Sequence, residues 1–185
     1  GTRQCTHQYG RPVTELLVQE WCARGAAIVS GLANGIDTIA HESTLRNGGR
    51  TVAVIASGID RITPLPAKHL AWRIVEHGGA VVSEHPCGVA ALPPYFPARN
   101  RIISGLSSAV VVVESKRTGG ALITADFALQ QGTALYAVPG PITSHRSEGC
   151  NALIAHGTAR MLCTADDVAE LPPADGTLFE RVALP

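Results

Sequence analysis

The segment Arg99-Asn100-Arg101 places two guanidinium groups and an amide at consecutive positions. It precedes the apolar pair Ile102-Ile103, where the sequence predicts that a helix begins. Guanidinium groups form paired hydrogen bonds with phosphate oxygens, and a helix N-terminus attracts anions. The preceding aromatic pair Tyr95-Phe96 is suited to stacking on nucleobases. The segment therefore indicates an anion site, with a set of solvated surface arginines as the alternative.

A second anion-binding pattern is the glycine pair Gly119-Gly120, which has Lys116 and Arg117 before it and Thr124 after it. Glycine lets a backbone approach a phosphate closely, and a strand-to-helix loop directs N–H groups at it. The alternative is an ordinary turn between a strand and a helix. Because the pair follows the aliphatic run 109–113 and lies beside two cations, we favour a binding loop.

The loop Gly31-x-Ala33-x-Gly35 follows another predicted strand, and Asp37 and His41 come after it. Asp37 and His41 are four residues apart, so they share one face of a helix. They are either a ligand contact or acid–base pair, or a local brace in which Asp37 stabilises the helix start and His41 packs beside it. We favour the brace because it needs no ligand.

Two glutamates, Glu84 and Glu114, each end a predicted strand. They are candidates for catalytic carboxylates. The alternative, which we favour, is that they cap neighbouring N–H groups or pair with arginines. Pro139-Gly140 follows a further strand and predicts a rigid turn that shapes the same edge of the sheet.

Motifs for nucleotide-dependent enzymes are missing from the sequence. It has no Gly-Lys dipeptide, which excludes a P-loop, and the strand after the 31–37 loop ends in Ala56-Ser57-Gly58 instead of the acid of a dinucleotide site. His41-Glu42 lacks the second histidine of a zinc protease, because position 45 is leucine. We therefore predict no cofactor, no metal and no catalytic residue. The cysteines form no short pair: Cys5, Cys22, Cys87, Cys150 and Cys163.

The composition predicts an aliphatic core and only local charge. Hydrophobic residues make up 45% of the 185 residues and aromatic residues only 4%, which is typical of a parallel sheet covered by helices. The formal net charge is zero, so any basic site must be local. An odd number of cysteines indicates a reducing compartment. The sequence has no signal peptide and no long apolar run, so we predict a cytoplasmic protein with no membrane contact.

Helical and strand-like patterns alternate, which predicts an α/β fold with a doubly wound, mostly parallel sheet. Residues 85–97 are proline-rich and irregular, and an acidic, proline-rich tail begins at 164. Gly1-Thr2-Arg3 reads as a loop that follows a strand, so we expect that the first strand of the sheet is missing from the chain. The predicted helices are 12–24, 36–47, 66–77, 98–106, 121–131 and 149–156, and the predicted strands are 26–30, 51–56, 80–83, 109–113, 134–138 and 159–163.

Taken together and in order, these segments resemble the DNA-processing protein A family, also called DprA or Smf. The resemblance covers about residues 1–163. It rests on these segments: Gly1-Thr2-Arg3; Ser30 to Asp37 with Ala40-His41; Ser57-Gly58-Ile59-Asp60; Ser83-Glu84; Phe96 to Ser104; Gly119 to Thr124; Val138-Pro139-Gly140; and Gly149-Cys150-Asn151-x-Leu153-Ile154.

The resemblance implies an extended Rossmann-like domain over 1–163, followed by a linker or tail over 164–185. It also implies single-stranded DNA binding, the loading of a RecA-type recombinase during natural transformation or related recombination, a homodimer, and no enzymatic activity. The DNA contacts that it implies come from Arg3, from Gly31 and Ala33, from 99–101 and from 116–124. One departure lies in the last loop, where family members often carry a basic residue and a serine before the glycine, and this chain has Thr118 and Gly119.

Two other functions remain open on a related fold. One is a nucleotide or phosphoribosyl hydrolase that uses Gly119-Gly120 with Glu84 or Glu114. Its usual Pro-Gly-Gly-x-Gly-Thr loop is absent, because Pro139-Gly140 is followed by Pro141. The other is a nucleotide-sensing module without catalysis.

Overall fold

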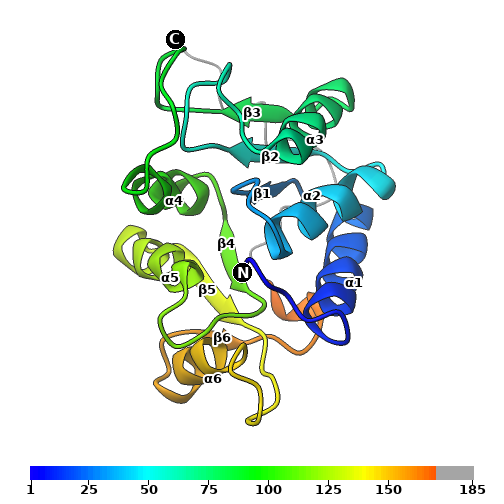
Figure 1. Cartoon of the computed structure of the whole chain (residues 1–185). Coiled ribbons are helices and arrows are strands. Elements are labelled where there is room, and N and C mark those ends of the chain that lie inside the picture. Colours follow the sequence, from blue (N-terminus) through cyan, green and yellow to red (C-terminus); the bar gives the residue numbers. More distant parts are fainter. Residues whose placement is uncertain (170–185) are drawn as a thin grey trace.

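The computed structural model describes residues 1–169, in which helices and strands alternate (Figure 1). Most predicted elements are present, with bounds that differ by a few residues. The predicted tail from 170 onward lies outside the described residues. In chain order the elements are α1 (Gly10–Ala23), β1 (Ile28–Ser30), α2 (Ile36–Arg46), β2 (Thr51–Val54), α3 (Leu65–Glu76), β3 (Ala80–Val82), α4 (Tyr95–Gly105), β4 (Ala109–Val112), α5 (Gly120–Gln131), β5 (Ala134–Ala137), α6 (Glu148–Ala155), β6 (Arg160–Met161) and the 3-10 helix η1 (Ala165–Asp167).

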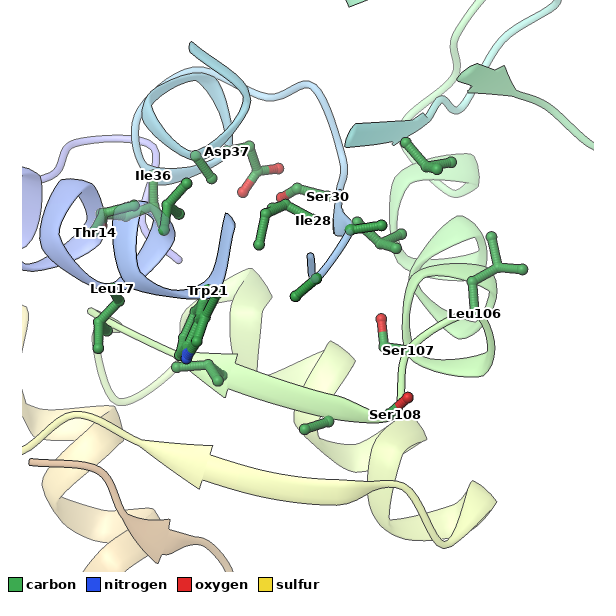
Figure 2. Close-up of a pocket in the computed structure, with 18 of the residues that line it drawn as sticks. Thr14, Leu17, Trp21, Ile28, Ser30, Ile36, Asp37, Leu106, Ser107 and Ser108 are labelled. Atoms are coloured by element: carbon green, nitrogen blue, oxygen red, sulfur yellow. The ribbon is translucent and has the colours of Figure 1, made fainter. Parts of the chain in front are cut away.

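All strand pairs among the described residues are parallel, which confirms the predicted α/β class. The strands form two sheets of three, in the orders β1-β2-β3 and β4-β5-β6. The prediction of one sheet is therefore corrected: within residues 1–169 no strand joins β1 to β4. An apolar cavity lies between these two strands instead (Figure 2).

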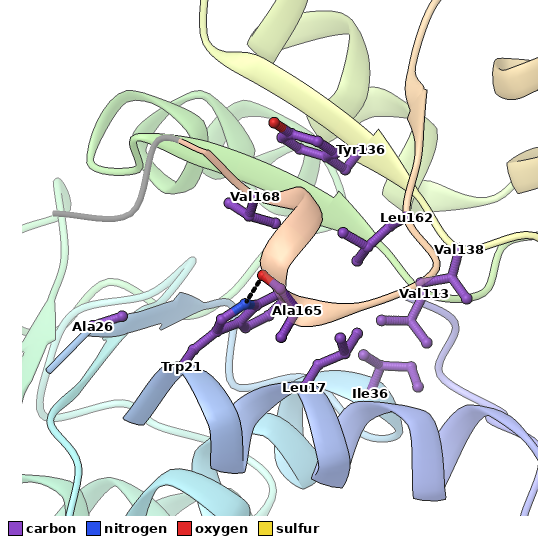
Figure 3. Close-up of a cluster of buried hydrophobic side chains, with 10 residues drawn as sticks. All are labelled: Leu17, Trp21, Ala26, Ile36, Val113, Tyr136, Val138, Leu162, Ala165 and Val168. Carbon is purple, nitrogen blue, oxygen red and sulfur yellow. Dashed lines mark hydrogen bonds between the residues drawn. The ribbon is translucent and has the colours of Figure 1, made fainter. Parts of the chain in front are cut away.

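Helices cover both faces of the β4-β5-β6 sheet. On one face, Val110 and Val112 pack against the small side chains of α5, such as Ala125, and against Cys150 of α6. On the other face, α1 and η1 form a cluster that includes Trp21 (Figure 3). This arrangement confirms the doubly wound prediction for this half of the molecule.

The chain remains packed after the predicted domain boundary at 163. The indole nitrogen of Trp21 donates a hydrogen bond to the Ala165 carbonyl at 3.2 Å (Figure 3). Ala165 and Val168 are both buried in the same cluster. The segment 164–168 therefore belongs to the folded unit, although the sequence predicts a linker from 164.

The β1-β2-β3 sheet is covered by α2 and α3. Ala53 and Ile55 at β2 are buried against Leu70 and Ile74 of α3, together with Leu45 of α2. The side chain of His41, on the same helix α2, is fully buried. Helix α2 thus connects the core to the loop that follows β1.

Helix α4 begins at Tyr95, earlier than the predicted 98. Pro97 is compatible with this earlier start, because N–H groups in the first turn of a helix have no acceptor within the helix and their loss costs no hydrogen bond. As a result Arg99-Asn100-Arg101 lies beyond the first helical residues. The prediction that this segment lies at the N-terminus of a helix is therefore wrong.

Candidate nucleic-acid interface

A groove of about 790 Å³ lies at the carboxyl ends of β1 and β4, where the loops of an α/β sheet gather. It is lined by the N-terminal loop, the β1–α2 loop, α4 and the start of α5. It brings together these predicted binding residues: Arg3, Ala33, Arg99, Asn100, Lys116, Gly119, Gly120 and Thr124. Gly31 lines an adjoining cavity of about 240 Å³ that also borders Arg3. Arg101 and Arg117 line neither.

Arg3 and Phe96 form a cation–π pair at the groove. The guanidinium carbon of Arg3 lies 5.5 Å from the centre of the Phe96 ring. Arg3 is exposed and Phe96 half-buried, so the pair presents both charge and an aromatic surface. Of the two aromatic residues in the predicted stacking pair, only Phe96 lines the groove; Tyr95 stacks on His85 with ring centres 4.3 Å apart.

The position of Arg3 depends on Gly35. The amide of Ile36 donates to the Thr2 carbonyl at 3.2 Å, which holds the N-terminal loop against the start of α2. Gly35 has φ +88°, and a Cβ there would overlap the Thr2 carbonyl oxygen and lie 2.7 Å from the Arg3 carbonyl carbon. Glycine is therefore required for both its conformation and its lack of a side chain.

We expect Gly35→Ala to destabilise the protein by about 1–3 kcal/mol, because of the positive φ and the backbone overlap. Urea denaturation would measure this loss. Gly48→Ala is a matched control, since Gly48 also has a positive φ of +66° but a Cβ at this position would meet no atom within 4 Å. Equal losses of stability in the two variants would show that the close contact between Gly35 and the N-terminal loop does not add to the cost of the substitution.

Arg99 is not a surface residue. Its side chain is only 4% exposed, and its Nη1 donates to the Gly31 carbonyl at 2.7 Å and to the Val54 carbonyl. Burial lowers the pKa of Arg99 and the neighbouring Asp37 carboxylate raises it, with burial the larger effect. Arginine remains charged in proteins. Arg99 therefore joins the β1–α2 loop to the end of β2, while it also lines the groove.

Asp37 and His41 both make contacts within the protein, of the kind that the brace interpretation predicts. Asp37 Oδ2 accepts hydrogen bonds from the amides of Gly31 at 3.2 Å and Ala33 at 3.4 Å. His41 Nδ1 lies 2.6 Å from the Thr51 hydroxyl, which itself lies 2.6 Å from the Ile28 carbonyl. A carbonyl only accepts, so the hydroxyl donates to Ile28 and His41 Nδ1–H donates to the hydroxyl. Burial lowers the pKa of His41 to about 4, which keeps the ring neutral.

The two strand-ending glutamates have structural partners, as expected. Glu84 forms an ion pair with Arg101. Glu114 is 1% exposed and accepts hydrogen bonds from the Thr6 amide at 2.9 Å and the Thr6 hydroxyl at 2.6 Å. Glu114 therefore anchors the N-terminal loop at the end of β4.

Comparison with known proteins identifies the family of this chain. The sequence model of the DNA recombination-mediator protein A family matches residues 1–172. The chain belongs to this family. It is 46% identical over 149 residues to Protein Smf of Escherichia coli K12, covering 80% of this chain and 40% of that protein.

Two solved structures of the family are similar to this fold. The X-ray structure of DNA processing protein A (DprA) from Streptococcus pneumoniae superposes with a TM-score of 0.82 at 42% identity, covering 91% of this chain and 58% of that one. A Helicobacter pylori DNA processing protein A, whose structure was reported for its single-stranded DNA binding mode, gives 0.81 at 28% identity, covering 90% and 74%. The chain thus spans 40% to 58% of the length of the first two relatives.

In this DprA-family chain the glycine loop departs from the family pattern at Thr118 and Gly119, and the structure shows the surroundings of Gly119. Gly119 caps α5, and a Cβ at this position would overlap the Ser115 hydroxyl. A serine at 119 would therefore require Ser115 to move. Lys116 and Gly120 are exposed, and a Cβ on Gly120 would meet no atom within 4 Å, so the start of α5 is open to a ligand.

The Pro139-Gly140 turn does not line the groove itself. The Asn151 side chain donates to the Gly140 carbonyl at 3.0 Å and accepts from its amide at 3.1 Å. The Tyr9 hydroxyl donates to the Pro139 carbonyl. This turn therefore connects α6 to the segment before α1.

Some groove residues were missed by the sequence analysis. Gln4, Ser30 and Ser115 line the groove beside the predicted residues. Ser30 ends β1 and Ser115 follows β4 closely, so their places at strand ends were the signal that could have found them.

Among residues 1–169, no group of three or more His, Cys, Asp or Glu side chains could hold a metal ion. Within the same residues no helix has the length and apolar character needed to cross a membrane.

Proposed function

We propose that this chain is the single-stranded DNA-binding domain of a recombination mediator. The observation that carries the proposal is the groove that unites the Arg3–Phe96 pair, Asn100, Lys116 and the Gly119-Gly120 loop at one edge. Single-strand binders combine a local basic groove with stacking surfaces and need no base-specific contacts. A net charge of zero is compatible with such a groove, because its cations are local.

In this proposal a phosphate lies at the start of α5. The exposed Gly120 leaves room for it, and the amides at the helix N-terminus attract it. Lys116 and Arg3, which both line the groove, supply positive charge. The Arg3 guanidinium lies over the Phe96 ring, and a base stacks beside this pair.

The proposal extends to the partners that the family suggests. We propose that the full protein delivers a RecA-type recombinase to single-stranded DNA, acts as a homodimer in the cytoplasm, and is not an enzyme. The family's description as recombination mediators and the DNA-bound mode described for the Helicobacter pylori relative support the DNA part. The hydrolase alternative needs Glu84 or Glu114 as a catalytic carboxylate. Glu84 is paired with Arg101 and Glu114 accepts hydrogen bonds from Thr6, so neither carboxylate is free for this role.

We expect Arg3→Ala to weaken binding of a labelled oligothymidylate by about 1–2 kcal/mol, or roughly tenfold, because a charge-assisted phosphate contact and one side of the aromatic pair are lost. The slope of log affinity against log salt should fall by about 0.7 for one lost phosphate contact. Fluorescence anisotropy across a salt series, with single strand and duplex, measures both quantities.

The matched control is Arg73→Ala, which removes an exposed arginine of α3 outside the groove. The proposed function fails if duplex binds as well as single strand, or if Arg3→Ala behaves like Arg73→Ala. Release of free base from a nucleoside monophosphate would instead favour the hydrolase.

A further inference from the structure

The side chain of Arg146 has no partner that balances its charge. Its Nε atom is buried and has no hydrogen-bond partner within residues 1–169. None of the ion pairs in this part of the chain includes Arg146. The residue is half-buried, so water reaches only part of it. Because removing a cation from water without supplying a partner is costly, this guanidinium indicates a place for an anion.

The backbone of Arg146 lies against the groove. Arg146 belongs to the loop between β5 and α6, and its carbonyl accepts a hydrogen bond from the Ser115 amide at 2.7 Å. Since β4 and β5 are parallel neighbours, the loops that follow them leave the sheet at the same edge (Figure 1). Ser115 and the next residue, Lys116, both line the groove. The loop that carries Arg146 is therefore fixed beside the loop that carries Lys116.

The start of α6 holds these two loops together through backbone atoms. The Gly149 amide donates to the Ser115 carbonyl at 2.9 Å. A Cβ on Gly149 would lie 2.6 Å from the Lys116 carbonyl oxygen, so the contact leaves no room for a side chain. None of these hydrogen bonds uses the guanidinium of Arg146. The side chain can therefore be replaced without removing the contacts that position the loop.

The guanidinium of Arg146 lies near the N-terminal loop. Burial raises the pKa of the Cys5 thiol, and the charges of Arg11 and Arg146 oppose this shift, so both arginines lie close to Cys5. Arg11 has a carboxylate partner, since it forms an ion pair with Glu15 at 3.4 Å. Gln4, which precedes Cys5, lines the groove. Arg146 thus supplies an unpaired cation at the rim of the groove, where the N-terminal loop approaches the loop after β4.

The one carboxylate of this region supplies no acceptor to Arg146. The Glu114 charge also acts on Cys5, so Glu114 lies in the same part of the molecule. Its two oxygens accept hydrogen bonds from the amide and the hydroxyl of Thr6. Glu114 is only 1% exposed, which prevents it from turning toward the rim without breaking these bonds. Acceptors for Arg146 must therefore come from outside the described chain.

We propose that Arg146 binds a second phosphate of the single strand, at the rim of the groove beside the phosphate at the start of α5. This inference rests on the proposed function. A guanidinium forms paired hydrogen bonds with phosphate oxygens, so a nucleic-acid backbone supplies both the acceptors and the charge that Arg146 lacks. The strand then extends from the start of α5 toward the loop between β5 and α6.

Arg146→Met should weaken the binding of a labelled oligothymidylate by about tenfold, because one charge-assisted phosphate contact is lost. The slope of log affinity against log salt should fall by about 0.7. In the double variant with Lys116→Met the slope should fall by about 1.4, since the two cations bind different phosphates. Fluorescence anisotropy across a salt series measures these quantities. Arg73→Met, the same change at an exposed arginine of α3 outside the groove, should alter neither affinity nor slope.

Two further measurements separate phosphate binding from a structural role. In the absence of DNA, Arg146→Met should not lower the midpoint of urea unfolding, because the side chain loses no partner within the protein. Arg146→Lys keeps the charge but not the paired donors of the guanidinium. It should therefore retain the salt slope of the unmodified protein while recovering only part of the affinity.

Three outcomes overturn the proposal. One is an Arg146→Met variant that binds like Arg73→Met. Another is a loss of binding that comes with a lowered urea midpoint, which would make Arg146 a structural residue. The third is a double variant whose slope falls no further than that of Lys116→Met alone, which would leave no second phosphate. If Arg3→Ala weakens binding and Arg146→Met does not, the proposed function stands and only this inference fails.

Discussion

Arg99→Met is expected to destabilise the protein by about 3–5 kcal/mol, because two buried carbonyls lose a charged hydrogen-bond donor. The guanidinium is 4% exposed and donates to the carbonyls of Gly31 and Val54. Methionine fills much of the space but donates no hydrogen bond. Two buried carbonyls lose a donor, and the attraction between Arg99 and the nearby Asp37 carboxylate is lost as well.

Urea denaturation measures this effect, and Arg101→Met is its internal control. Arg101 lies two residues further along α4 and is half exposed, with an ion pair to Glu84. An exposed pair contributes about 0–1 kcal/mol, so the control should lose little. Similar losses for Arg99→Met and Arg101→Met would contradict the buried role of Arg99.

Acidification should destabilise the protein through His41. In the folded state the pKa of His41 is about 4, below its ordinary value of 6.5, because the ring is fully buried. As the pH falls below 6.5, the unfolded chain binds a proton before the folded chain does. Folding stability therefore decreases from pH 6.5 down to about 4 and then levels off, and the loss from this group alone is about 3 kcal/mol.

Comparison with His41→Asn isolates this contribution. The asparagine amide retains a donor near the Thr51 hydroxyl but does not titrate. Unfolding free energies at intervals between pH 7 and 4 should fall less steeply in the variant, by about 3 kcal/mol over the range. Carboxylates with lowered pKa values, such as Glu15 and Asp167, act equally in both proteins. Parallel pH profiles for the two proteins would show that His41 titrates normally.

Much of the candidate site could be predicted because parallel strands bring their carboxyl ends to one edge. Ala33 and Lys116 are far apart in the chain, yet each follows the carboxyl end of a strand. The brace formed by Asp37 and His41 was predictable for a similar reason, since it depends on one helical turn and the loop before it.

The roles of the two arginines of α4 could not be predicted. Arg99 and Arg101 are two residues apart, so they point to nearly opposite sides of the helix. Sequence alone does not say which side packs against the sheet, and it also misplaced the start of the helix by three residues. Docking of α4 buries Arg99 beneath the β1–α2 loop and leaves Arg101 outside, paired with Glu84.

By itself the sequence determined the alternating elements, the parallel α/β class, the family, and the loops that meet at the groove. These depend on periodicity, turn residues and strand ends, which are local along the chain. Only the tertiary structure decided that Arg99 is internal, that Phe96 and not Tyr95 lines the groove, and that an apolar cavity lies between β1 and β4. Burial and strand neighbours depend on segments distant in sequence, and no local pattern records which segments those are.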